Sequence, residues 1–116
     1  MQGLAASTAA VVVVYHLATD IEPTLRLLQR SVARLLVVDN HEQGHARLAD
    51  VARRLQIDCL KAGNVGGLAG AYNRALAWLQ VHEPRMAQVV FLDEDSDPSR
   101  LAALLADGNT ARTLAS

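Results

Sequence analysis

Four short apolar segments alternate along the chain with stretches in which apolar residues recur at helical spacing. The apolar segments are rich in β-branched residues and nearly continuous, as in strands buried on both faces of a parallel sheet. They cover residues 10–15, 35–39, 57–61 and 88–93. A strand followed by a helix thus occurs four times, which predicts parallel strands joined by right-handed crossovers.

Amphipathic stripes and end signals define the intervening helices. The predicted stripes are Ile21, Leu25, Leu28 and Val32; Leu48, Val51, Ala52 and Leu55; and Leu68, Tyr72, Ala75, Leu76 and Leu79. Pro23 suits a first helical turn, and Gly108 suits the residue after a helix end. Asp97 and Pro98 suit the N-cap and first position of a last helix. We therefore predict a three-layer α/β fold, with a mostly parallel four-stranded sheet and helices on both faces.

Composition and charge narrow the class of protein. A chain of 116 residues, of which 51% are hydrophobic and 3% aromatic, fits one small α/β domain spanning residues 1–116. The net charge of −1 provides no basic surface, so we expect no nucleic-acid partner. The single Cys59 excludes an internal disulfide, and the apolar run at 9–15 is too short for a membrane span. These features predict a cytoplasmic protein, or one that works at the inner face of the membrane as part of a longer chain.

The unusual polar and glycine-rich stretches all follow predicted strands. They begin at Tyr15, at Asp39, at Gly63 and at Asp93. Ligands of open parallel sheets bind at the carboxyl ends of the strands. Four such stretches at one edge therefore predict a binding site there.

Each stretch alone has two interpretations. The glycines from 63 to 70 suit either an anion at a helix start or a tight turn into a closely packed helix, and they fit neither a dinucleotide fingerprint nor a P-loop. Asp93 and Asp95, two apart, can direct both carboxylates to one hard cation such as Mg²⁺ or Mn²⁺, or can form a solvated acidic turn. Asp39 can stabilise a turn or accept a hydrogen bond from a base or ribose, and Tyr15 offers a face for stacking.

Four further residues are assigned structural positions. His41 and His45 have a helical metal-ligand spacing, but no third ligand accompanies them, so we expect a solvated loop and helix start. Cys59 is expected to be a core thiol, and Trp78 to lie on or near the packing face of the third helix.

Taken together, the strand ends resemble the N-terminal, donor-binding half of a family 2 glycosyltransferase of the GT-A fold, closest to its rhamnosyltransferase-like branch. The family has a strand ending in Tyr-Asn, a strand ending in Val-Asp-Asn, a stretch of the form Asn-x-Gly-(x)-x-Ala-x-Ala-x-Asn, and a strand ending in Leu-Asp-x-Asp-Ser. Here these appear in order as VVVVYH, LLVVDN, NVGGLAGAYNRAL and VVFLDEDSDP. The resemblance implies a Rossmann-like fold and a metal-dependent Asp-x-Asp motif for inverting transfer from a UDP- or dTDP-linked sugar to a glycan acceptor.

The resemblance also implies roles for individual residues. Tyr15 would lie against the nucleobase and Asp39 would hydrogen-bond to it. Asn64 and Gly66 would line the donor pocket, supported by Asn73 and Arg74. Asp95 would bind the divalent metal, and Asp93 would reach the ribose or sugar and contribute to the metal site. His16 replaces the family's Asn, and Gly67 lengthens the glycine loop by one residue.

The family's acceptor site and acidic general base follow the Asp-x-Asp strand, whereas this sequence ends about one helix later. The resemblance therefore implies no catalytic base in this fragment, no sugar transfer by it alone, and an apolar surface through which copies form a homo-oligomer. The alternative hypothesis is a non-enzymatic, Mg²⁺-binding receiver-like or regulatory module. A receiver, however, needs acidic residues after its first strand and a phosphorylatable Asp after its third, where this chain has Tyr-His and KAGN.

Overall fold

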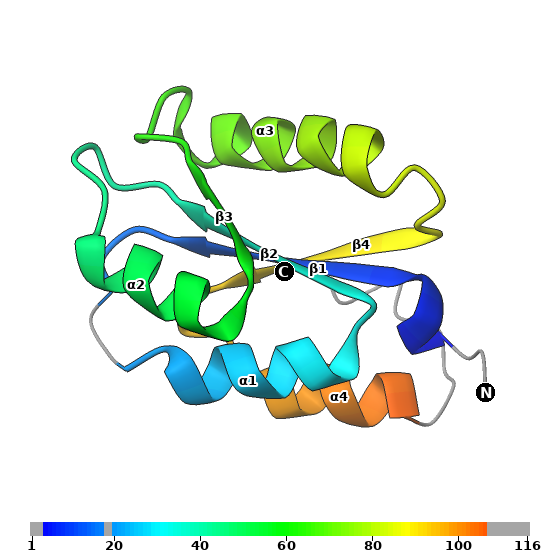
Figure 1. Ribbon diagram of the computed structural model, residues 1–116. Coiled ribbons are helices and arrows are strands. Elements are labelled where there is room, and N and C mark those ends of the chain that lie inside the picture. The colour runs from blue at the N-terminus through cyan, green and yellow to red at the C-terminus, as the bar shows by residue number, and fades with distance from the viewer. Residues whose placement is uncertain (1–3, 18–19, 107–116) are drawn as a thin grey trace.

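The computed structural model describes residues 4–17 and 20–106 (Figure 1). Its sheet consists of β1 (Thr8–Val14), β2 (Arg34–Asp39), β3 (Asp58–Lys61) and β4 (Gln88–Asp93). All three strand pairs are parallel, and the order across the sheet is β3-β2-β1-β4. The helices are α1 (Glu22–Ser31), α2 (Ala46–Leu55), α3 (Gly67–His82) and α4 (Pro98–Ala106), and a short 3-10 helix, η1 (Leu4–Ser7), precedes β1. Strand and helix alternate as predicted.

The helices form two layers around the sheet. Helices α1, α2 and α4 cover one face, and α3 covers the other (Figure 1). This arrangement confirms the predicted three-layer α/β fold, and all strand pairs are parallel instead of only most of them. None of the helices within residues 4–17 and 20–106 is long and apolar enough to cross a bilayer.

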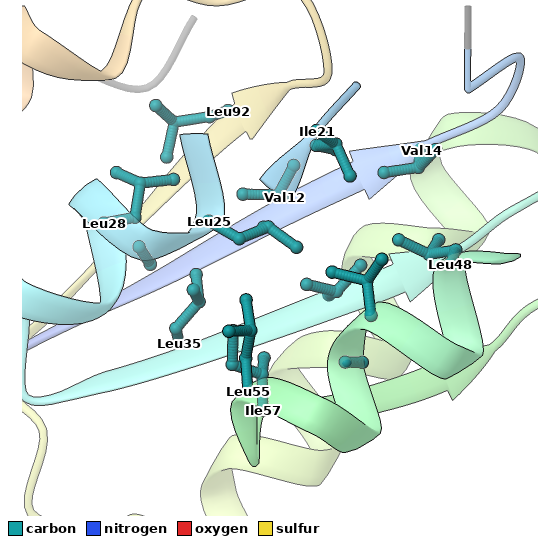
Figure 2. Close-up of a cluster of buried hydrophobic side chains, with 14 of the residues drawn as sticks. Val12, Val14, Ile21, Leu25, Leu28, Leu35, Leu48, Leu55, Ile57 and Leu92 are labelled. Atoms are coloured by element: carbon teal, nitrogen blue, oxygen red, sulfur yellow. The ribbon is translucent and has the colours of Figure 1, made fainter. Parts of the chain in front are cut away.

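The central strand β1 contributes to both hydrophobic layers. Its alternate residues Ala10, Val12 and Val14 point into the cluster under α1, α2 and α4, where Leu25 and Leu28 are fully buried (Figure 2). The other three, Ala9, Val11 and Val13, lie beneath α3. Successive strand residues face opposite sides of a sheet, so a strand covered on both sides is apolar throughout. That burial explains the continuous run of valines.

The predicted stripe of the third helix is wrong in part. Leu68 and Leu76 are 48% and 42% exposed, and the residues of α3 buried against the sheet are Ala71, Ala75 and Leu79. Both sets recur at three- or four-residue spacing, so helical periodicity alone cannot separate them. The larger leucines suggested the first set, whereas the small alanines are what allow the helix to lie close to β1 and β2. Trp78 packs against this cluster, as predicted.

The predicted helix-end signals are confirmed where the structure describes them. Pro23 is the second residue of α1, and Pro98 is the first residue of α4. Asp97 caps α4, because its Oδ1 accepts hydrogen bonds from the Ser99 N–H at 3.0 Å and from the Ser99 hydroxyl at 2.7 Å. The Ser99 hydroxyl, and then its N–H, lower the pKa of Asp97. Gly108 lies outside the described residues.

Cys59 is a partly buried thiol that packs against the α1–α2 side of the core, as predicted. Burial, with a smaller contribution from the charge of Asp39, raises its pKa to about 11. The folded state therefore favours the neutral thiol. This contribution to stability is complete below the unfolded pKa of about 8.5 and declines as the pH rises toward 11.

We expect the alkylation rate of the folded chain by iodoacetamide to keep rising beyond pH 10, because the thiolate is the nucleophile. Cys59 is the only cysteine, so tandem mass spectrometry that locates the modification at Cys59 separates it from amines that are alkylated at high pH. The urea-unfolded chain, whose thiol should titrate near its ordinary pKa of about 8.5, is the control. A rate for the folded chain that levels off near pH 9 would contradict the assignment.

Candidate functional site

A cavity of about 490 Å³ opens at the carboxyl edge of the sheet. Its polar lining residues come from all four strand ends: Tyr15 and His16, Asn40, Asn64, and the acidic residues Asp93, Glu94 and Asp95. The strand order places this cavity at the point where the chain changes direction, because β2 lies on one side of β1 and β4 on the other. Such a topological switch point is where open α/β sheets bind ligands.

Glu94 holds the end of β1 in place. Its Oε1 accepts hydrogen bonds from the N–H groups of Tyr15 at 2.8 Å and His16 at 2.9 Å, and its Oε2 accepts one from Leu17 at 2.7 Å. Three consecutive N–H groups around a carboxylate form an anion-binding turn. Leu17 adopts a positive φ of 53°, which is unusual for a residue with a side chain. The carboxylate and the burial of the Leu17 side chain maintain this turn.

Asp93 and Asp95 flank Glu94 and line the same cavity. Both are exposed, and within the described part of the chain neither carboxylate makes a hydrogen bond or an ion pair. The described residues contain no group of three or more His, Cys, Asp or Glu side chains placed to hold a metal ion. Two carboxylates nevertheless fit a hard cation that completes its coordination shell with ligand oxygens and water. This pair is therefore the part of the site suited to a divalent cation.

Glu42 connects the end of β1 to the glycine loop. It accepts hydrogen bonds from the Tyr15 hydroxyl at 2.9 Å and from the Asn64 amide at 3.0 Å. The bond to Glu42 raises the pKa of Tyr15. The pKa of Glu42 is lowered by its own backbone N–H, by Tyr15 and by Asn64. Tyr15 also contacts the His41 ring, with 5.3 Å between centroids, so its ring position is fixed.

Asn40 is 3% exposed and fastens the glycine loop to β2. Its Oδ1 accepts from the Asn64 N–H at 2.9 Å, and its amide nitrogen lies 3.3 Å from Asn64 Oδ1 and 3.4 Å from the Gly67 carbonyl oxygen. Asn64 has a φ of 60°, a left-handed conformation that Asn tolerates better than most residues. Asn40 therefore determines where Asn64 enters the cavity.

Asp39 is 1% exposed, and both of its carboxylate oxygens have hydrogen-bond partners within the chain. Its Oδ2 accepts from the His45 N–H at 2.6 Å, and its Oδ1 accepts from the His41 N–H at 3.3 Å and lies 3.0 Å from His45 Nδ1. The bond to His41, two residues along the chain, is the turn interaction that the sequence suggests as one alternative. Asp39 is not among the lining residues of the cavity, and its contact with a nucleobase stays a prediction.

The side chain of His45 is less exposed to solvent than predicted. His45 precedes α2, as predicted, but its side chain is only 17% exposed and its ring pairs with Asp39. The histidine spacing alone gave no sign of this pair, because Asp39 lies six residues earlier, on a strand end.

The glycine loop turns β3 into α3 through two close approaches of the backbone. Gly66 precedes α3 with a φ of 77°, which glycine adopts without steric cost. A Cβ at Gly70 would lie 2.0 Å from the carbonyl oxygen of Val65, so only glycine fits there. Both glycines thus serve the tight turn, and the cavity is lined here by Asn64 of the loop and by Leu68 in the first turn of α3.

Asn73 and Arg74 lie farther along α3 and are exposed. Neither lines the main cavity. Arg74 instead lines a second cavity of about 360 Å³, on the other side of the glycine loop, together with Lys61 and Gly63. Of the predicted donor residues, Tyr15, Asn64, Asp93 and Asp95 thus line the first cavity and Arg74 lines the second. Asp39, Gly66 and Asn73 line neither of these two cavities.

Comparison of the chain with protein-family models, with curated proteins and with solved structures found no match in any of the three.

Three residues that shape the site were not assigned to it from the sequence: Asn40, Glu42 and Glu94. Glu94 lies between two predicted site residues, and strand alternation would send its side chain to the opposite side. Its partners on the β1 loop follow from the adjacency of β1 and β4, which the sequence does not reveal. Glu42 lies in a loop without any periodic signal.

We expect Glu94→Gln to reduce the free energy of unfolding by about 2 kcal/mol, because the carboxylate accepts three hydrogen bonds and an amide has only one acceptor oxygen. Urea denaturation in EDTA measures the change. Asp95→Asn removes the same charge at the next residue of the chain and loses no hydrogen bond, so it should shift the free energy of unfolding by less than about 0.5 kcal/mol. Equal effects of the two variants would contradict the role of Glu94.

We expect Gly70→Ala to cost about 3 kcal/mol of stability, since the new methyl group must displace the Val65 carbonyl. Gly67→Ala is the matched control. Gly67 has a φ of 64° but open space around its Cβ, so this variant should cost only about 1 kcal/mol of backbone strain. Thermal and urea unfolding of both variants give the comparison, and a smaller loss for Gly70→Ala would contradict it.

Proposed function

We propose that this chain binds the nucleoside-diphosphate sugar donor of a family 2 glycosyltransferase, with a divalent cation, at the carboxyl edge of its sheet. One observation supports this most. Tyr15, Asn64, Asp93 and Asp95, which come from three separate stretches of the family-like sequence, line one cavity of about 490 Å³. That volume suits a ligand of nucleotide size.

The open carboxylates supply the attraction for a cation. Asp93 and Asp95 carry charge that nothing in the described chain neutralises by direct pairing, and Asp95 is the residue that we assign to Mg²⁺ or Mn²⁺. When bound, such a cation stabilises the negative charge that develops on a leaving diphosphate. Asp93 would reach the ribose or sugar as well as the cation.

The neutral side chains would orient the organic part of the donor. The Tyr15 ring is held through its hydroxyl by Glu42, which suits it to stack against a nucleobase. Asn64 lines the cavity near the start of α3, where N–H groups and the helix dipole favour the diphosphate. Asp39, Gly66, Asn73 and Arg74 remain proposed donor-binding residues by resemblance, with UDP or dTDP as the nucleotide.

The receiver-like alternative is less well supported. Flavodoxin-like folds have the strand order 2-1-3-4-5, whereas this sheet runs β3-β2-β1-β4, which corresponds to the first four strands of the dinucleotide-type order 3-2-1-4-5-6. We assign no general base among the cavity residues, and transfer to a sugar acceptor would require one. The lone thiol and the nucleotide-sugar ligand fit a cytoplasmic location, which we also propose.

Calorimetric titration of UDP and of dTDP into the chain, first with Mn²⁺ and then with EDTA, tests the proposal. We expect binding in Mn²⁺ that EDTA abolishes. Asp95→Asn should weaken it by about tenfold or more, a loss of roughly 1.4 kcal/mol. The control Asp50→Asn removes the same charge from the outer surface of α2 and should leave the affinity unchanged.

Two outcomes would overturn the proposal. Nucleotide binding equal in Mn²⁺ and EDTA would exclude a metal-dependent site at Asp95. Heat from Mg²⁺ or Mn²⁺ alone, with none from nucleotide at any metal concentration, would favour the regulatory module instead.

A further inference from the structure

Strand β4 forms an outer edge of the sheet and lacks the features that usually protect such an edge. Among residues 4–17 and 20–106 it pairs only with β1, and its residues before Asp93 include no Lys, Arg, Glu or Pro. The opposite edge, β3, has only four residues, two of which are the charged Asp58 and Lys61. Charged, short or proline-containing edge strands resist pairing with another chain. The two edges therefore differ, and β4 is the one suited to pairing.

An apolar surface continues from β4 onto α3. The ring of Tyr72 contacts that of Phe91 on β4, with 4.3 Å between centroids. Leu68 and Leu76 lie four residues before and after Tyr72, on the same side of the helix, and are about half exposed. Val89 is only partly buried beside them. These five residues, Leu68, Tyr72, Leu76, Val89 and Phe91, are called the β4 strip below.

Charge differs between the two ends of β4. Arg85, which precedes the strand, is exposed and makes no ion pair within the described part of the chain. Asp93 ends the strand, and Asp95 follows it. A second β4 laid parallel would bring like charges together, whereas an antiparallel one brings Arg85 toward the partner's acidic end. The edge is thus complementary to itself under two-fold rotation, as an isologous interface requires.

We propose that two copies of this chain associate through antiparallel pairing of their β4 strands, about a two-fold axis between Val90 and Phe91. Main-chain hydrogen bonds would join the two sheets into one, as in strand-addition complexes. The two β4 strips would meet beside the axis and bury their exposed leucines. This inference does not rest on nucleotide binding, and its test uses neither nucleotide nor metal.

Sedimentation equilibrium of the chain in EDTA, from low to high micromolar concentration, tests the proposal. We expect a monomer–dimer equilibrium that ends at twice the 12.5 kDa of the chain. Arg85→Glu and Asp95→Arg should each raise the dimer dissociation constant by about tenfold, because each turns attraction into repulsion at two symmetric contacts. The double variant should return to the value of the unaltered chain, because the exchanged charges attract again.

A second pair of variants examines the β4 strip. Leu76→Ser should weaken the dimer, whereas Val81→Ser, which removes an apolar side chain that is 76% exposed on another side of α3, should not. Far-ultraviolet circular dichroism on each variant confirms that it is folded. A monomer at every concentration, open-ended aggregates, or a dimer unaffected by both charge reversals and by Leu76→Ser would overturn the proposal.

Discussion

The geometry of the candidate site depends on one carboxylate, that of Glu94. Its hydrogen bonds to three consecutive N–H groups join the loop after β1 to the loop after β4. Those loops flank the point at which the strand order changes direction. The three N–H groups lie beyond Val14, the last residue of β1 that pairs with β2. A buried or half-buried N–H needs an acceptor. Glu94 supplies it and fixes the distance between Tyr15 and the acidic turn.

The acidic residues after β4 therefore differ in whether their carboxylates bind the fold or face the open cavity. Glu94 binds the backbone of the first loop, and Asp97 caps α4 through Ser99. Asp93 and Asp95 alternate with Glu94 and stay in the open cavity. The density of negative charge at the end of β4 thus has two causes. Glu94 and Asp97 accept hydrogen bonds from N–H groups at the ends of β1 and α4. Asp93 and Asp95 are the carboxylates that a cation in the cavity would contact.

The sequence predicted those aspects of the molecule that depend on periodicity. The valine run of β1, the stripe of α2 and the Asp97 cap are local patterns, and the structure contains each of them. It also predicted that the strand ends gather at one edge, because parallel strands leave no alternative. Which leucines of α3 face the sheet could not be predicted, since two sets of residues have the same helical period.

The unpredicted part of the site consists of contacts between loops. Asp39 pairs with His45, Glu42 bridges Tyr15 and Asn64, and Asn40 holds the glycine loop. The pair of Asp39 and His45 closes the connection between β2 and α2. The other two contacts join residues on different connections, and their partners depend on strand order, which no local pattern encodes. The contacts of Glu42 and Asn40 hold Tyr15 and Asn64 in place from within the chain. A side chain already held in its binding position loses less conformational entropy when a ligand arrives. If the proposed donor binds here, the loop contacts would add to its affinity without touching it, and Glu42 would act in this way through its bonds to Tyr15 and Asn64.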